Sequence, residues 1–171
     1  MIATFGDGAY KLFLVLHLLT AIVGFGALVA MGILGARAAG HGGQEGPVIF
    51  DYVVTSRWAE WVVYAVPVFG IITLLLSDDV WKFSQVWVSL SFVLFIVYVG
   101  VFHGLHLPNL KRMNVLMKEL GGGAPAAPAG GGRPPQVSEL AERGQKAGIF
   151  GGILNLTLVV IVVLMVWKPG V

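Results

Sequence analysis

Four long apolar stretches dominate the pattern of hydrophobic and polar positions along the chain. They cover approximately residues 10–36, 57–77, 83–107 and 147–167, and the segments between them are expected to be loops. Apolar residues follow one another without strict alternation, which is typical of helices rather than of membrane strands. An apolar helix of about 20 residues spans the hydrocarbon core of a bilayer, which is about 30 Å thick. The pattern therefore predicts an all-α fold, a bundle of four transmembrane helices.

The connection between the third and fourth stretches has three parts. Residues 109–120 can continue the third helix beyond a kink at Pro108, because an amphipathic pattern runs through them. Its apolar positions are Leu110, Val115, Leu116 and Leu120, with Lys and Arg between them. Residues 121–135 are rich in Gly and Pro, which predicts a flexible tether. Ser138 is expected to cap a helix that runs directly into the fourth span. Since no segment is long enough for a second domain, we expect residues 1–171 to form a single membrane domain.

The composition agrees with this picture and excludes several kinds of chemistry. Hydrophobic residues make up 57% of the chain and charged residues 12%, which is too apolar for a water-soluble domain. The net charge of +2 comes from Lys and Arg in the loops, so it does not indicate binding to nucleic acid. The chain has no cysteine, which excludes disulfides, thiolate metal sites and cysteine nucleophiles.

The basic residues predict the orientation of the spans, because loops rich in Lys and Arg stay in the cytoplasm. Placing both termini outside puts most of these residues inside. The inner residues are then Arg37, Arg57, Lys111, Arg112, Lys118, Arg133, Arg143 and Lys146, and the outer ones are Lys11, Lys82 and Lys168. We therefore expect a multi-pass protein of the cytoplasmic membrane with its N-terminus and C-terminus outside.

Small residues at helical spacing mark faces on which helices can approach each other closely. These residues are Gly24, Gly26, Gly100, Gly104, Gly148 and Gly152. Such pairs are frequent in membrane helices, so they favour packing within the bundle over a dedicated dimer face.

Ionisable residues inside a span are the first candidates for function, because they are costly unless paired. His17 follows Lys11 by six residues, which places it about 9 Å below the outer end of the first span. His103 lies about 31 Å along the third span, so the two imidazoles differ in depth by about 20 Å and cannot sandwich one haem iron in straight helices. Two interpretations of His17 stay open: a neutral imidazole bonded to a neighbouring hydroxyl, or a ligand of haem b together with another ligand type. The hydroxyl candidates at this depth are Thr73, Ser89 and Ser91.

A second polar group is predicted at the inner boundary of the membrane. Glu60 begins the second span and His103 and His106 end the third, so an antiparallel hairpin brings them to one level. With their i, i+3 spacing, the two histidines and Glu60 would offer a three-ligand metal site. The interpretation that the sequence favours is a structural cluster of ion pairs and hydrogen bonds among Arg37, Arg57, Glu60 and His103.

The sequence LHLLTAIVGFG at residues 16–26, together with residues 98–103 and the basic segment after them, carries a resemblance. This arrangement resembles the DUF2269-type bacterial membrane proteins, which are similar in turn to the wider copper-resistance-D-like group. The resemblance covers the four-span core and implies a bacterial membrane protein of that fold. Distant relatives with a histidine in the first span are haem-associated proteins of porphyrin metabolism, which implies a haem-ligand role for His17, with His103 as a second candidate.

Four apolar helices with small loops and little chemistry inside the membrane favour a non-enzymatic protein, a subunit or accessory component of a larger membrane complex. The expected partners are the lipid bilayer and other membrane subunits, and no cofactor is expected. The alternative is a b-haem-binding redox or porphyrin-handling protein that uses His17. A small transporter comes third, because no span is broken in its middle and the bundle is too small for inverted repeats.

Overall fold

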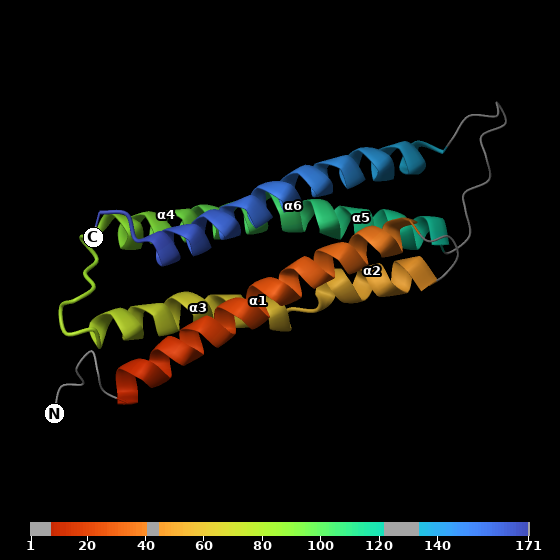
Figure 1. The fold of residues 1–171 in the computed structure, drawn as a ribbon. Helices are drawn as coiled ribbons and strands as arrows, with labels where there is room; N and C mark the ends of the chain where they lie inside the picture. The colour runs from red at the N-terminus through yellow and green to blue at the C-terminus, as the bar shows by residue number, and fades with distance from the viewer. Residues whose placement is uncertain (1–7, 41–44, 122–133, 171) are drawn as a thin grey trace. The chain divides into compact units, whose positions relative to one another are not determined.

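The protein is described by a computed structural model, which covers residues 8–40, 45–121 and 134–170. These residues form helices and turns, without a strand among them, which confirms the predicted all-α fold class. In chain order the elements are α1 (Gly8–Gly40), α2 (Glu45–Thr55), α3 (Trp58–Leu75), α4 (Val86–Val101), the π-helical η1 (Phe102–His106), α5 (Leu107–Gly121) and α6 (Pro135–Trp167) (Figure 1).

Four stretches of the described residues are long and apolar enough to cross a membrane. They are Gly8–Gly40, Glu45–Leu75, Val86–Gly121 and Pro135–Trp167. Between 11% and 33% of the residues in their most apolar windows are buried inside the protein, so most of this apolar surface is available to lipid. The side of the membrane on which each end of the chain lies stays a prediction from the basic residues.

The described residues form two compact units. Unit 1 draws on residues up to Val29, on Arg57–Val97 and on residues from Thr157 onward. Unit 2 draws on Ala30–Ser56 and Tyr98–Leu156. Helices α1 and α6 contribute residues to both units. The single membrane domain of the sequence analysis stays a prediction.

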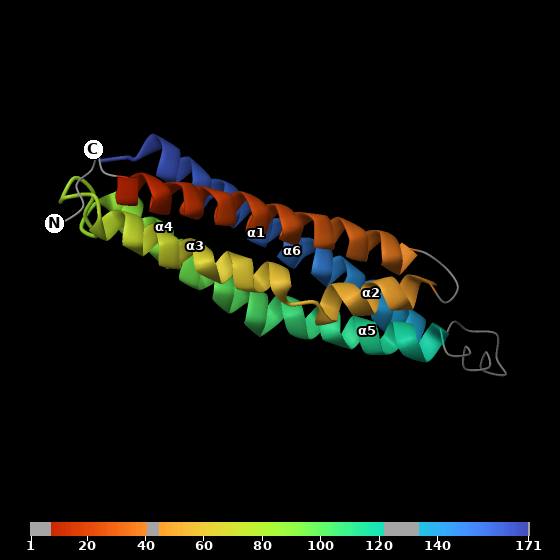
Figure 2. The ribbon, with the colours of Figure 1, turned by 90° about the horizontal axis from the view of Figure 1, so that it is seen from below.

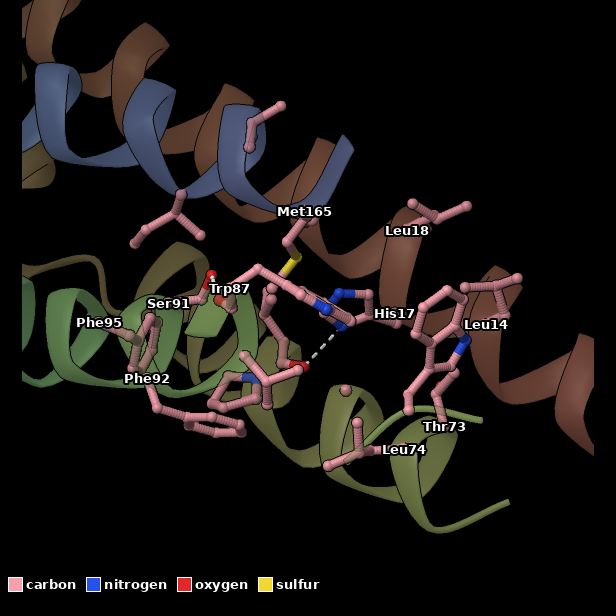
Figure 3. A pocket seen from close by; sticks show the side chains of 18 of the residues that line it. Leu14, His17, Leu18, Thr73, Leu74, Trp87, Ser91, Phe92, Phe95 and Met165 are labelled. Carbon is pink, nitrogen blue, oxygen red and sulfur yellow. Dashed lines mark hydrogen bonds between the residues drawn. The ribbon is translucent and has the colours of Figure 1, made fainter. Parts of the chain in front are cut away.

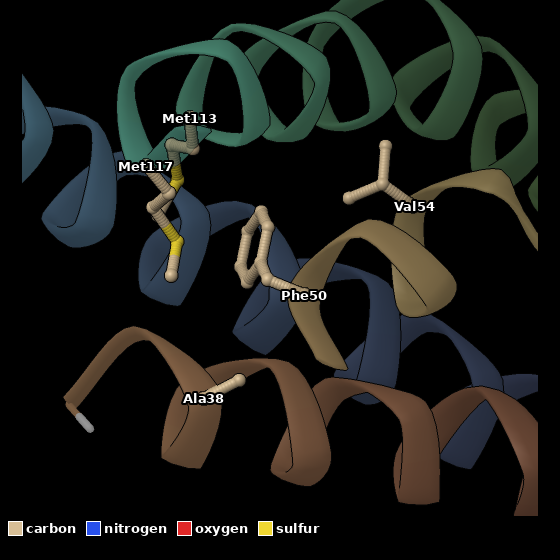
Figure 4. Packing of buried hydrophobic residues seen from close by; sticks show 5 residues of the cluster. All are labelled: Ala38, Phe50, Val54, Met113 and Met117. Atoms are coloured by element: carbon tan, nitrogen blue, oxygen red, sulfur yellow. The ribbon is translucent and has the colours of Figure 1, made fainter. Parts of the chain in front are cut away.

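Unit 2 has an apolar core between α2, α5 and the end of α1. Helices α2 and α5 lie side by side in both views (Figures 1 and 2). Phe50 of α2 is 2% exposed and lies between Ala38 of α1 and the methionines Met113 and Met117 of α5 (Figure 4). The flexible methionine side chains fill the irregular space around the ring. This core holds three helical segments of unit 2 together.

Hydrogen bonds and ion pairs between charged and polar side chains also connect α2 with α5, and α5 with the first turns of α6. Asp51 of α2 accepts a hydrogen bond from Asn114 at 2.7 Å and pairs with Lys118 at 2.7 Å, both on α5. Between α5 and α6, the carboxylate of Glu139 accepts from Arg112 at 3.0 and 3.1 Å, and from Arg143 of its own helix at 2.9 Å. These polar contacts therefore connect the three helices in addition to the apolar core.

Three local predictions need correction. Helix α2 lies where the sequence predicts a loop, because its Val and Ile residues favour strands and hide the helical pattern. Helix α6 begins at Pro135, three residues before the predicted cap at Ser138, since proline suits the first turn of a helix. The continuation of the third span exists as α5, but Val115 is exposed on it. Residues 122–133, most of the predicted tether, lie outside the described residues.

The kink expected at Pro108 takes the form of a widened turn before it. The N–H of Leu107 bonds to the carbonyl of Phe102, five residues earlier, which defines η1 as a π-helical turn. Pro108 has no N–H, and its ring crowds the carbonyl four residues earlier in a regular α-helix. The wider turn gives the ring room without ending the helix.

Candidate ligand-binding site

Unit 1 contains a partly open cavity between α3, α4 and the adjoining parts of α1 and α6 (Figure 3). Its volume is about 260 Å³. Most of the lining is apolar and aromatic, with Leu14, Leu18, Phe92, Phe95 and Met165 among the residues that form it. Pockets for drug-sized ligands begin at about 300 Å³, so the cavity suits a smaller molecule.

Close packing of α1 on α3 fixes one wall of the cavity. A Cβ atom at Gly24 would lie 3.0 Å from Cγ2 and 3.1 Å from the backbone nitrogen of Val63, so only glycine permits this approach without a shift. Two turns before Gly24, the same face of α1 carries His17. The glycine contact therefore brings the imidazole against α3.

His17 is buried, with 8% of its surface exposed, and it forms a hydrogen bond to the backbone of α3. Its Nδ1 lies 2.9 Å from the carbonyl oxygen of Val66, and the dashed line in Figure 3 marks this bond. A carbonyl oxygen only accepts hydrogen bonds, so Nδ1 must carry the proton. In the neutral ring Nε2 then carries a lone pair and no proton. His17 therefore offers an acceptor nitrogen in the cavity that it lines.

Gly70 makes room for this imidazole. A Cβ atom at Gly70 would lie 3.0 Å from Cε1 and 3.1 Å from Nδ1 of His17. Gly70 is also four residues beyond Val66, so the missing side chain leaves the Val66 carbonyl open from the side while it still accepts its helical bond. Sequence reasoning missed Val66, because a backbone acceptor has no residue type that marks it, and it also missed Gly70.

The predicted hydroxyl partners of His17 are wrong, because each bonds to a backbone carbonyl near it in sequence. Thr73 donates to Phe69 at 2.8 Å, and Ser91 donates to Trp87 at 2.7 Å. Ser89 donates to the carbonyl of Phe83. A Ser or Thr hydroxyl lies close to backbone carbonyls near it in sequence, so it forms this local hydrogen bond in preference to a bond with an imidazole on another helix.

Two tryptophans and a lysine form another part of the lining. The indole N–H of Trp81 donates to the hydroxyl oxygen of Tyr10 at 3.3 Å, and Trp87 meets Trp81 edge to face. The ammonium of Lys168 lies 3.8 Å from the ring centroid of Trp81 and 5.6 Å from that of Trp87, within range of a cation–π contact. Ser77, fully buried, holds the turn by accepting from the N–H of Trp81 at 3.0 Å.

Trp87 leaves a polar atom unpaired in this lining. Trp87 is 8% exposed, and its Nε1 is buried without a hydrogen-bond partner among the described residues. An unpaired buried donor costs about 1–3 kcal/mol. The cavity lining thus includes residues with one acceptor, His17, and one donor, Trp87.

Glu60, the carboxylate predicted at the inner boundary, is buried in unit 1 and paired there. The guanidinium of Arg57 and the hydroxyl of Tyr64 each donate to Oε1 of Glu60 at 2.8 Å. Arg37 and His103 belong to unit 2, so their part in the predicted polar cluster stays a prediction.

The two histidines of the predicted metal site lie in η1. The ring of Phe102 contacts His103 edge to face at 5.1 Å between centroids, and its centroid lies 6.0 Å from that of His106. The wider π-turn turns the two imidazoles farther apart than the α-helical spacing would. Within residues 8–40, 45–121 and 134–170, no group of three His, Cys, Asp or Glu residues could hold a metal ion. The proposed third ligand, Glu60, belongs to unit 1, so a metal site stays a prediction.

The predicted packing glycines differ in their surroundings. Gly24 packs on Val63 as described above. At the other five a Cβ atom would meet no described atom within 4 Å: Gly26, Gly100, Gly104, Gly148 and Gly152. Their role in helix packing stays a prediction.

The chain was also compared with known families and proteins. A family model described as predicted integral membrane protein (DUF2269) matches residues 11–169. No curated protein and no solved structure matches the chain significantly. The matched region contains most of each of the four candidate spans, as well as His17 and Gly70. The chain therefore belongs to the DUF2269 family of predicted integral membrane proteins.

Proposed function

We propose that this membrane protein binds a small, neutral, largely apolar molecule in the cavity of unit 1, and that His17 recognises it. One observation carries the proposal. The bond from Nδ1 to the Val66 carbonyl fixes the tautomer and leaves Nε2 as an acceptor in an apolar lining. A ligand that donates a hydrogen bond to Nε2 in this apolar lining is stabilised.

Binding rather than catalysis is supported by the lining of the cavity. Its described ionisable residues are Tyr10, His17 and Lys168, and no carboxylate lies among them. General acid–base catalysis uses groups that converge on one reacting atom. Here the ammonium of Lys168 lies over the faces of two indole rings. The lining therefore supports binding as the proposed role.

2-Naphthol is a suitable first probe, because it is small and largely apolar and its hydroxyl can donate to Nε2 of His17. Its affinity can be measured by calorimetry with the protein in lipid nanodiscs, against empty nanodiscs. Ala21 lines the cavity, so Ala21→Leu should fill part of it and weaken binding by about tenfold or more. Ala30→Leu makes the same change at an exposed position of the same helix and should leave the affinity unchanged. Absent binding to the wild-type protein, or equal affinity in both variants, contradicts the proposal.

Haem b was the alternative ligand for His17. A haem-ligating histidine commonly donates its other ring N–H to a carbonyl, and His17 does so to Val66. The cavity, however, has about 260 Å³, and haem is larger than the drug-sized ligands whose pockets begin at about 300 Å³. His17 fits the role of a ligand, but the space does not fit the macrocycle. We therefore assign no step of the function to haem.

A second proposed function is that of a subunit in a larger membrane complex, and the open glycines of unit 2 support it. Gly148 and Gly152 on α6 are spaced so that a helix could approach closely, and no described atom occupies that space. The double variant Gly148→Leu, Gly152→Leu should then lose larger partners when the protein is purified in mild detergent. The control is Gly32→Leu, at an exposed position of α1 with open space around it, and it should keep them. A wild-type particle no larger than one 18.2 kDa chain in its micelle contradicts this role.

A further inference from the structure

We propose that the molecule bound beside His17 is a hydroxylated aromatic ring, a phenol or hydroquinone, whose O–H donates to Nε2. The inference rests on the proposed function and adds the chemical class of the ligand. Two properties of the cavity carry it: the direction of the hydrogen bond, and the size and aromatic lining of the space.

The direction of the hydrogen bond selects a donor. Because the Val66 carbonyl holds the proton on Nδ1, Nε2 can only accept. A ketone, a quinone or an ether offers acceptors alone, and it could bond to His17 only if the proton moved to Nε2 and the Val66 bond broke. A hydroxyl donates without any change in the protein. The site therefore discriminates a hydroquinone from the corresponding quinone.

The size of the cavity suits one or two rings. An apolar cavity of about 150 Å³ holds one benzene molecule, so about 260 Å³ accommodates a substituted ring or two fused rings. The lining is strongly aromatic. Its aromatic residues include Phe25, Trp81, Trp87, Phe92 and Phe95. Aromatic side chains pack favourably with an aromatic ring in offset or edge-to-face contacts.

The test compares 2-naphthol with 2-methoxynaphthalene, which has the same ring system and lacks the O–H. Calorimetry with wild-type protein in nanodiscs should give about tenfold tighter binding of 2-naphthol. His17→Phe should remove this preference, because its ring has no acceptor, and the ratio between the two ligands within each variant cancels their different partition into lipid. His106→Phe makes the same change outside the cavity and should keep the preference.

The outcomes separate the ligand class from the proposed function. Equal affinity of the wild-type protein for both ligands, with binding still weakened by Ala21→Leu, overturns the hydroxylated class and leaves the binding function standing. Absence of binding by either ligand overturns both. A further pair is 1,4-dihydroxynaphthalene, measured under reducing conditions, and 1,4-naphthoquinone, measured under oxidising conditions. Tighter binding of the quinone would mean that the site prefers an acceptor to a donor, which also overturns the class. The wild-type comparisons keep the test decisive even if His17→Phe does not fold.

Discussion

Replacing Gly70 by leucine should destabilise the protein, because the new side chain would occupy the space of the His17 imidazole. The Cβ atom alone would lie 3.0 Å from Cε1 and 3.1 Å from Nδ1, and three further carbons follow it. The ring must then leave, and the 2.9 Å bond to Val66 breaks. Overpacking costs about 1–3 kcal/mol and the lost hydrogen bond about 1 kcal/mol, which gives a loss of about 2–4 kcal/mol.

The matched control is Gly32→Leu. A Cβ atom there would meet no described atom within 4 Å, and the change in helix propensity is the same for both positions. The difference between the two variants therefore isolates the contact with His17. At about 2–4 °C per kcal/mol for a chain of this size, the midpoint of thermal unfolding should differ by about 4–16 °C. Size-exclusion chromatography after stepwise heating in detergent measures this midpoint.

Equal midpoints for Gly70→Leu and Gly32→Leu would refute the reasoning. Such a result would mean that the His17 ring does not lie against Gly70. It would also remove the physical basis for a fixed tautomer.

Three further predictions concern charge, topology and colour. Glu139 lies at the polar end of α6, outside the apolar stretch, and the two arginines that donate to it lower its pKa from 4.5 to about 2. Its carboxylate therefore stabilises the protein fully above pH 4.5, and this stabilisation is lost as the pH falls towards 2. In Glu139→Gln, the midpoint of thermal unfolding should depend less on pH over that range. Single cysteines at Gly8 and Gly170 should react with an impermeant thiol reagent on intact cells and a cysteine at Gly130 should not, and the opposite pattern would reverse the orientation. The purified protein should show no Soret band, and a band that disappears in His17→Ala would restore haem as the ligand.

The spans could be predicted from the sequence because the bilayer acts on every residue of a span. Continuous apolar runs have no other stable solution in lipid than a helix, so the stretches at 10–36 and 147–167 identify α1 and α6. Helix α2 could not be found in this way. It lies outside the most apolar stretches, and contacts of Phe50 with Met113 and Met117 stabilise it more than its local preference does.

His17, the residue of the proposed function, could be singled out from the sequence, but its environment could not. His17 stands out as an ionisable residue within a span. Its partner is the carbonyl of Val66, and any residue type presents a carbonyl. The one signal was Gly70, four residues after Val66, since a glycine in a span indicates close approach of another group.

The protonation of His17 tests the central claim most directly. Nitrogen-15 magnetic resonance of histidine-labelled protein in lipid distinguishes a protonated ring nitrogen from one with a lone pair, and spectra of His17→Phe identify the signals of this residue among the four histidines. We predict a proton on Nδ1, a lone pair on Nε2, and a shift of the Nε2 signal when 2-naphthol is added and not when 2-methoxynaphthalene is added. A proton on Nε2 in the ligand-free protein would contradict the account, because the cavity would then present a donor where a hydroxyl ligand needs an acceptor.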